Sequence, residues 1–133
     1  MARRRDARRL AVSILYQADL AARPPGEVLA EHRSLGSRVP GFAEQLVRGV
    51  EEKREELDRL IGEHAEGWTV ARMAAVDRAV LRVACYEMLF REDVPAAVAI
   101  DEAVAAAKEL STEASGRFVN GVLGRIARER AQA

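Results

Sequence analysis

Residues 80–90 read VLRVACYEMLF and are apolar on almost every side of a helix. A helix that is apolar nearly all round has to be packed on several sides, so this stretch predicts a central, buried helix. It ends a helical region expected over residues 68–91. Elsewhere apolar residues recur at helical spacing, and no segment alternates with period two. We therefore expect an all-α protein.

Turn-forming residues divide the rest of the chain. Arg23-Pro24-Pro25-Gly26 ends the first helix, and Pro95 suits the first turn of a later one. The expected helices cover residues 6–22, 27–33, 42–64, 68–91, 96–110 and 112–128. Apolar positions predict their buried faces: Leu10, Ile14, Leu15 and Ala18; Phe42, Leu46, Val50, Leu57 and Ile61; Ile100, Val104, Ala107 and Leu110; Val119, Val122 and Ile126. We expect about six or seven helices in a single compact domain over residues 1–133.

Composition sets the broad class. Of the 133 residues 49% are hydrophobic and 5% aromatic, which is typical of a helical protein with a real core. The single cysteine, Cys85, cannot form an internal disulfide. The basic start has no apolar stretch behind it, and no run approaches the roughly 18 apolar residues that span a bilayer. These features predict a soluble protein of a reducing cytoplasm, without membrane contact.

Residues with catalytic potential are few. His32 and His64 lie far apart without a Cys or His at ligand spacing, so no metal site is expected. Cys85 lies in the most apolar helix, where a lone cysteine is usually a small buried hydrophobe. Neither a phosphate-binding loop nor a nucleophile elbow is present. We expect no enzyme activity and no cofactor.

The net charge of zero conceals an asymmetry. Residues 1–9 carry five Arg and one Asp, a net charge of +4, and residues 117–130 carry four Arg and one Glu, a net charge of +3. The other residues therefore sum to −7. Two basic ends on an acidic body indicate a localised anionic partner. A solvated, disordered basic tail is the alternative that charge alone leaves open.

The basic ends also carry aromatic residues. On the first helix Arg5, Arg9, Val12 and Tyr16 share a stripe away from the expected core, with Arg8 beside it. Guanidinium groups bind phosphates through forked hydrogen bonds, and an exposed tyrosine ring offers a surface for an unpaired base. Packing of Tyr16 against a neighbouring helix explains this stripe equally well.

The last helix carries a second candidate surface. Arg117, Gly121, Gly124 and Arg128 follow one another at helical spacing, and the glycines leave that flank flat for a partner helix or a nucleic-acid backbone. Helix packing is the commoner explanation. Phe118 at the start of this helix fits either the core or a stacking surface.

Three stretches resemble the NusB family of transcription antitermination factors: ARRRDARRLAVSILYQ (2–17), DRAVLRVACYEMLFREDVPAAVAIDEAV (77–104) and GRFVNGVLGRIAR (116–128). The resemblance covers nearly the whole chain and is weakest over residues 23–40. It implies an all-helical fold of two small bundles sharing one core. It also implies binding of single-stranded boxA RNA together with the ribosomal protein NusE, and assembly with other Nus factors on RNA polymerase at ribosomal RNA operons.

The resemblance implies site residues as well. Its arginine-rich motif falls on Arg3, Arg4, Arg5 and Arg8, with Tyr16 as the aromatic residue. Its second RNA-facing patch falls on Arg117 and Phe118, and its NusE-facing region falls on Asp77 and Arg78. Two positions depart from the family pattern, because Arg9 and Ala114 stand where many relatives have acidic residues. Both changes remove negative charge near the expected RNA.

Two alternatives and one question stay open. A related helical domain precedes the catalytic domain of ribosomal RNA cytosine methyltransferases, and it would fit if the sequence were a fragment. A purely structural helical adaptor is the other alternative. The sequence does not decide between a monomer and a homodimer.

Overall fold

The central helix expected from residues 80–90 is α4, Ala75–Phe90, in the computed structural model, which describes residues 3–132. It packs against α1, α3, α5 and α6, which confirms that it is enclosed on several sides. The other elements are α1 (Arg3–Ala21), α2 (Pro25–Ser34), α3 (Gly41–His64), the 3₁₀ helix η1 (Val70–Arg72), α5 (Ala96–Leu110) and α6 (Glu113–Gln132). No strand occurs in the described part of the chain, so the all-α prediction is confirmed.

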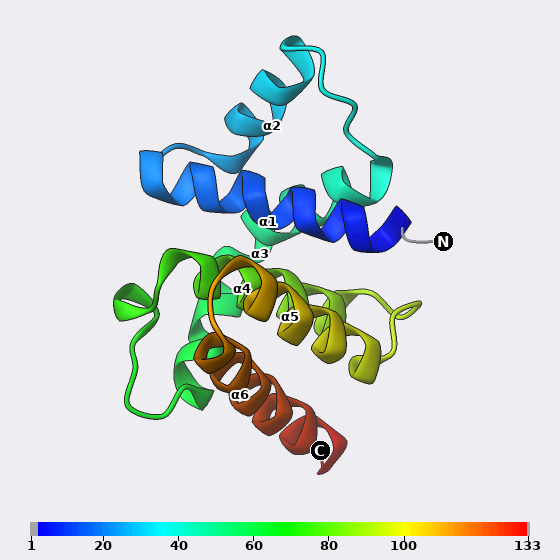
Figure 1. Ribbon diagram of the computed structural model, residues 1–133. Helices are drawn as coiled ribbons and strands as arrows, with labels where there is room; N and C mark the ends of the chain where they lie inside the picture. The colour runs from blue at the N-terminus through cyan, green and yellow to red at the C-terminus, as the bar shows by residue number, and fades with distance from the viewer. Residues whose placement is uncertain (1–2, 133) are drawn as a thin grey trace.

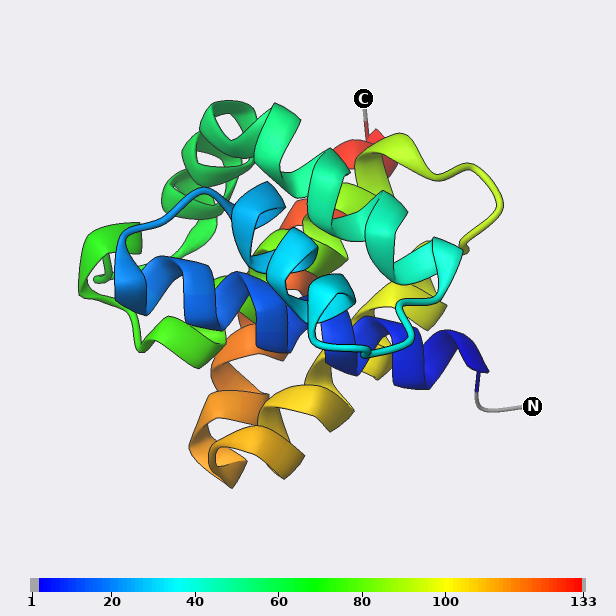
Figure 2. The ribbon, with the colours of Figure 1, turned by 90° about the horizontal axis from the view of Figure 1, so that it is seen from above.

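The helices form two groups that share one core. In Figure 1, α1 and α2 lie above α4, α5 and α6. The long helix α3 belongs to both groups, because it packs against α1 and α2 as well as α4 and α6. Figure 2 shows α2 lying across α1 when the molecule is seen from above. Buried apolar side chains from all six α-helices make one continuous cluster. None of the helices within residues 3–132 is long and apolar enough to cross a membrane.

The prediction of a helix over residues 68–91 is wrong for its first third, because α4 begins only at Ala75. Gly67 adopts a left-handed conformation with φ of +77°, and Met73 is extended, so only the short η1 forms between them. Arg78 explains this break, because its Nη1 donates to the backbone carbonyls of Val70, Ala71 and Met73. These carbonyls accept hydrogen bonds from a side chain, and the Val70 carbonyl also accepts the backbone N–H of Met73, which closes η1.

The buried face of α5 also differs from the expected one. Its fully buried residues are alanines, namely Ala99, Ala103, Ala106 and Ala107. Of the residues expected there, Ala107 is buried, Ile100 and Val104 are half-buried, and Leu110 is 44% exposed. Small side chains let α5 approach α4 and α6 closely, and the larger ones lie at the margin of the contact.

A second close approach joins α3 to α4. A Cβ atom at Gly49 would lie 2.1 Å from Cζ of Tyr86, well inside van der Waals contact. The tyrosine ring therefore occupies the space that any larger residue at position 49 would need. This contact fixes the distance between the helix that links the two groups and the helix at their centre.

Candidate nucleic-acid interface

The arginine-rich start of the chain forms the first turns of α1. Arg3, Arg4 and Arg5 are exposed, whereas Arg8 is only 7% exposed. Arg8 stands one turn before Val12, which is buried at 4% exposure, so both side chains share a covered face of the helix. The guanidinium groups at the start of α1 therefore differ in their access to a ligand.

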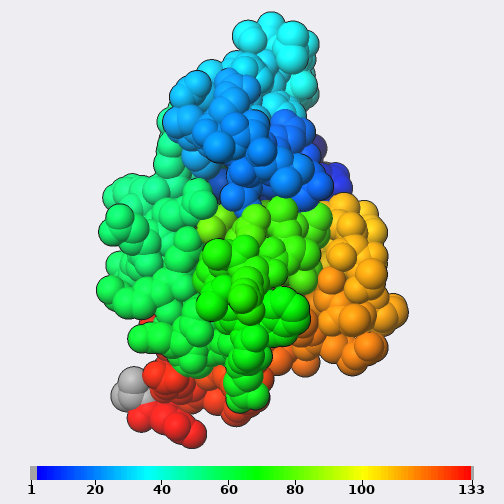
Figure 3. Space-filling view, turned by 90° about the vertical axis from the view of Figure 1, so that its left-hand side faces the viewer, coloured from blue at the N-terminus to red at the C-terminus, as the bar shows by residue number. Residues whose placement is uncertain are grey.

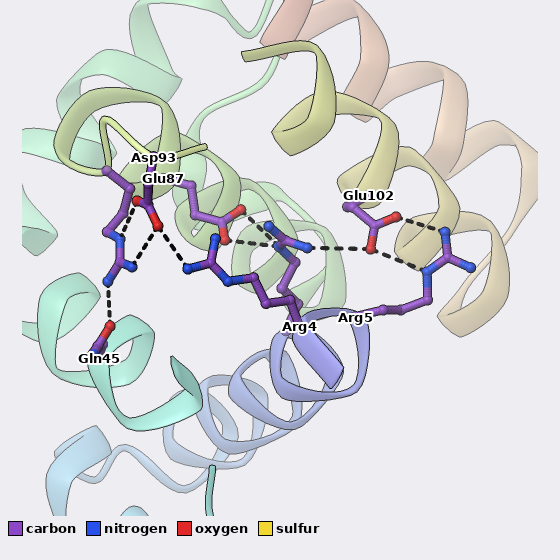
Figure 4. A network of polar contacts seen from close by, with 8 residues as sticks. Arg4, Arg5, Gln45, Glu87, Asp93 and Glu102 are labelled. Carbon is purple, nitrogen blue, oxygen red and sulfur yellow. Dashed lines mark hydrogen bonds and ion pairs between the residues drawn. The ribbon is translucent and has the colours of Figure 1, made fainter. Parts of the chain in front are cut away.

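Carboxylates from α5 and from the loop before it face these guanidinium groups (Figure 4). Arg4 Nη2 donates to Oδ2 of Asp93 at 2.7 Å, and Arg5 donates to both oxygens of Glu102 at 2.7 and 3.2 Å. Arg4 and Arg91 hold the pKa of Asp93 far below its ordinary value, with the Arg91 hydrogen bond as the larger cause. The arginine-rich segment thus ties α1 to α5 and to the loop before it.

Arg8 makes the one buried ion pair of this group. Its Nε lies 2.9 and 3.0 Å from the two carboxylate oxygens of Glu87 on α4, and a third contact at 3.6 Å reaches Glu102. The Glu87 side chain is 1% exposed. Burial raises the pKa of Glu87, and the neighbouring Arg8 opposes this shift without cancelling it. The Arg8 guanidinium therefore satisfies a buried charge inside the fold.

An aromatic ring that the sequence assigned to the core lies beneath the arginines. The guanidinium carbons of Arg4, Arg91 and Arg8 stand 4.3, 5.0 and 5.4 Å from the ring centre of Phe42 on α3. Guanidinium groups at such distances are attracted to the ring face. Phe42 is half-buried, so it supports the cluster from below. No local sequence signal marks this role, because Phe42 and the arginines belong to different helices.

The stripe expected from Arg5 to Tyr16 is only partly exposed. Val12 is buried, and Tyr16 is half-buried against the core. The covering residues come from α4 and α5, which lie along this side of α1. Arg9, which precedes Val12 by about one turn of α1, is half-buried and donates to Glu109 at 3.1 Å. Accessible positive charge on α1 is therefore concentrated in its first turn.

The second expected patch lies at the start of α6. Arg117 is exposed, and Phe118 is half-buried. The Phe118 ring meets the ring of Trp68 edge to face, with centroids 6.5 Å apart and an angle of 72°. Trp68 is 52% exposed and was not among the expected site residues. A lone tryptophan just after a glycine turn was the only signal that could have suggested it.

Asp77 and Arg78 at the start of α4 both have internal roles. Besides holding η1, Arg78 donates through Nε to Oδ2 of Asp19 at 2.8 Å. Asp77 is 8% exposed, and Ser115 donates a hydrogen bond to its Oδ2 at 3.4 Å. Burial raises the pKa of Asp77. Neither side chain is widely accessible, and only Asp77 lies beside Trp68.

The structure does not join the two candidate patches. Within residues 3–132, no hydrogen bond, ion pair or aromatic contact links the arginines of α1 to Arg117 or Phe118. Figure 1 shows the start of α1 at one side of the molecule and the start of α6 nearer the other end of α1. An RNA strand touching both would have to run along the molecule.

Cys85 and His64 are both held within the fold. Cys85 is fully buried, and burial raises its thiol pKa to about 12, so the thiol is not reactive. His64 bonds the carbonyl of Leu60 at 2.8 Å and the carboxylate of Glu129. In the described part of the chain, no cluster of three His, Cys, Asp or Glu residues could hold a metal ion.

Comparison with known proteins places the chain in a family. The chain matches the NusB family model over residues 5–128. It is 53% identical to the transcription antitermination protein NusB of Saccharopolyspora erythraea over 130 residues, 96% of this chain and 88% of that protein. The Thermotoga (T. maritima) NusB structure is 38% identical, with a TM-score of 0.83 over 95% of this chain and 91% of that one.

One further solved structure combines the fold with an RNA. A chain from the crystal structure of antitermination factors NusB and NusE in complex with double-stranded RNA is 29% identical to this chain. Its TM-score is 0.84, and the match covers 97% of this chain and 99% of that one. Sequence, family model and three-dimensional similarity therefore agree: the chain belongs to the NusB family.

Proposed function

We propose that this protein is a transcription antitermination factor that binds single-stranded boxA RNA together with the ribosomal protein NusE. It would act with other Nus factors on RNA polymerase at ribosomal RNA operons, in the bacterial cytoplasm. The name of the S. erythraea relative and the NusB–NusE–RNA structure support this proposal. The match to 88% of that relative favours it over the front domain of a larger methyltransferase.

The observation that carries the proposal is the exposed row of guanidinium groups on the first turn of α1. The ion pairs of Arg4 with Asp93 and of Arg5 with Glu102 leave about half of each arginine side chain exposed, and exposed ion pairs contribute little to stability. Arg4 also lies over the Phe42 ring. A phosphate can replace a carboxylate there, because it accepts the same forked hydrogen bonds. Arg3 adds a cation with no ion pair among residues 3–132. These three arginines form the proposed phosphate contacts.

The other expected site residues have different roles in the proposed function. Arg117 is exposed and can contact a phosphate, and Phe118 and Tyr16 each present part of a ring. Arg8 acts by keeping α1 in place through Glu87. Asp77 and Arg78 shape the start of α4, the surface that we assign to NusE. The protein works as a binding module, with RNA and NusE as its ligands and no chemical step of its own.

RNA binding with and without purified NusE tests the proposal. A filter-binding assay at fixed salt would compare a short boxA RNA with a scrambled RNA of equal composition. We expect tighter binding of boxA RNA and a further gain when NusE is present. Equal, weak binding of both RNAs in both conditions would instead support a structural adaptor. Light scattering on the same samples would show whether a homodimer hides the arginines before RNA is added.

A further inference from the structure

Three arginine side chains share one aromatic ring, that of Phe42 at the start of α3. The guanidinium carbon of Arg4 lies over this ring at 4.3 Å from its centre, and those of Arg91 and Arg8 lie at 5.0 and 5.4 Å. A cation over the face of an aromatic ring is attracted by the negative charge of that face. Of the three arginines, Arg4 comes closest to the ring.

Arg4 is also the arginine of this group that a ligand can reach. Its side chain is 48% exposed, whereas the side chains of Arg8 and Arg91 are 8% and 20% exposed. Arg8 is held by Glu87, and Arg91 donates to both carboxylate oxygens of Asp93 at 3.0 and 3.1 Å. Two of the three cations therefore serve the fold, and the third faces solvent.

The first turn of α1 is not held by packing. Residues 3–6 are all exposed, and Ala7 is the first buried residue of the helix. Figure 3, which views the opposite end of the molecule, shows the blue chain of α1 between the cyan chain of α2 and the green chain below it. Packing therefore fixes the body of α1, whereas the Arg4 side chain is placed by its contacts with Phe42 and Asp93.

The core of the fold anchors the Phe42 ring. Phe42 lies in the first turn of α3 and is half-buried. The next residue, Ala43, and Leu46 one turn later are both fully buried. A phenylalanine side chain also has only two rotatable bonds, so little of its freedom remains once its base is fixed. The ring is therefore a rigid support beneath a long and otherwise flexible arginine.

The ring and a phosphate use different parts of the Arg4 guanidinium. An aromatic ring attracts a guanidinium through its flat face, whereas hydrogen bonds are donated by the N–H groups in its plane. In the protein without RNA, Asp93 accepts one such bond from Nη2 at 2.7 Å (Figure 4). A phosphate that replaces this carboxylate leaves the contact with the ring in place. The ring thus restricts the side chain before RNA arrives, which lowers the entropy lost on binding.

We propose that Phe42 is a positioning residue of the RNA site, whose ring holds the Arg4 guanidinium where a phosphate of the bound strand meets it. The inference rests on the proposed RNA-binding function and adds to it a residue that touches no RNA itself. Glu87 and Asp93 neutralise the cations beside Arg4, so mutual repulsion does not drive Arg4 off the ring.

Phe42→Leu keeps an apolar side chain and removes the ring. In filter binding of a short boxA RNA at fixed salt, with NusE present if binding requires it, this variant should bind roughly 2- to 12-fold more weakly, the cost of immobilising one long side chain. Phe42→Tyr retains a ring and should bind as the wild type does. Phe90→Leu is the matched control, because Phe90 is also half-buried and has Lys53 over its ring at 5.1 Å. An equal loss of affinity in Phe90→Leu would overturn the inference.

A double-mutant cycle with Arg4→Gln separates positioning from a general effect on the fold. Because the ring acts through Arg4, Phe42→Leu should cause no further loss of RNA affinity in a protein that already carries Arg4→Gln. An equal loss on both backgrounds would show that Phe42 only stabilises the fold, and would overturn the inference. Urea denaturation checks that every protein compared in this cycle is folded.

The wild-type protein allows a measurement that does not depend on the folding of any Phe42 variant. Ring currents should shift the Arg4 side-chain protons upfield in NMR spectra of both the free and the RNA-bound protein, and Arg4→Gln identifies these signals. Unshifted Arg4 signals, or normal RNA affinity of folded Phe42→Leu, overturn the positioning role and leave the RNA-binding function intact. Failure of the folded wild-type protein to bind RNA, with and without NusE, overturns both.

Discussion

Replacement of Arg8 by methionine should destabilise the fold before it affects any RNA contact. The Arg8 and Glu87 side chains are 8% and 1% exposed, and their closest atoms are 2.9 Å apart. Removing the cation leaves a buried carboxylate without its partner, which costs about 3–5 kcal/mol of unfolding free energy. The double variant Arg8→Met/Glu87→Met removes both charges at similar volume, so it should recover most of this loss.

Urea denaturation followed by circular dichroism at several pH values measures the effect. Because burial raises the pKa of Glu87 above its ordinary value, the folded protein holds this proton more tightly than the unfolded chain. The stability linked to this group is therefore present at low pH and is lost as the pH rises through the raised pKa. Without Arg8 that pKa rises further, so the deficit of Arg8→Met should be small in acid and largest near neutral pH. A deficit under about 1 kcal/mol at neutral pH, or one equally large in acid, would refute the buried pair.

Three further substitutions have definite expected outcomes. Gly49→Ala should lower the unfolding free energy by about 1–3 kcal/mol because its Cβ meets a tyrosine ring. Gly62→Ala on the same helix, with 3.8 Å to its nearest neighbour, should instead leave the stability unchanged or raise it by up to about 1 kcal/mol in the same thermal melts. Ala22→Gly should raise stability by about 1 kcal/mol, since Ala22 has φ of +53°; an unchanged melting temperature would contradict this. Glu102→Gln should tighten RNA binding in filter assays by releasing Arg5 from a charged partner, and weaker binding would speak against carboxylate competition.

Much of the fold could be predicted because its signals are local. The all-round apolar pattern of residues 80–90 identified α4, and Pro24, Pro25 and Pro95 marked helix boundaries that the structure has within a few residues. The helix prediction for the segment after Gly67 was wrong because the shape of this segment depends on the Arg78 side chain, which binds carbonyls five to eight residues earlier. On α5 the largest apolar residues were expected inside, but close helix packing selected alanines.

The sequence predicted which residue types make up the candidate site, but not how these residues are arranged in space. An arginine-rich start was visible, yet its carboxylate partners lie 79 to 100 positions away in sequence, and no spacing rule pairs them. Charge counting therefore treated Arg8 as equal to Arg4, although one is buried and the other exposed. The contact between Trp68 and Phe118 was missed for the same reason, since the two residues are 50 positions apart and only folding brings them together.

The salt dependence of RNA affinity tests the guanidinium–phosphate contacts on α1. If about four phosphates are neutralised, the logarithm of the binding constant should fall with the logarithm of salt concentration at a slope of about −3. Arg4→Gln/Arg5→Gln removes two of the proposed contacts and should make that slope shallower by about 1.4. A wild-type slope near zero, or an unchanged slope in the folded double variant, would show that RNA does not bind through these arginines.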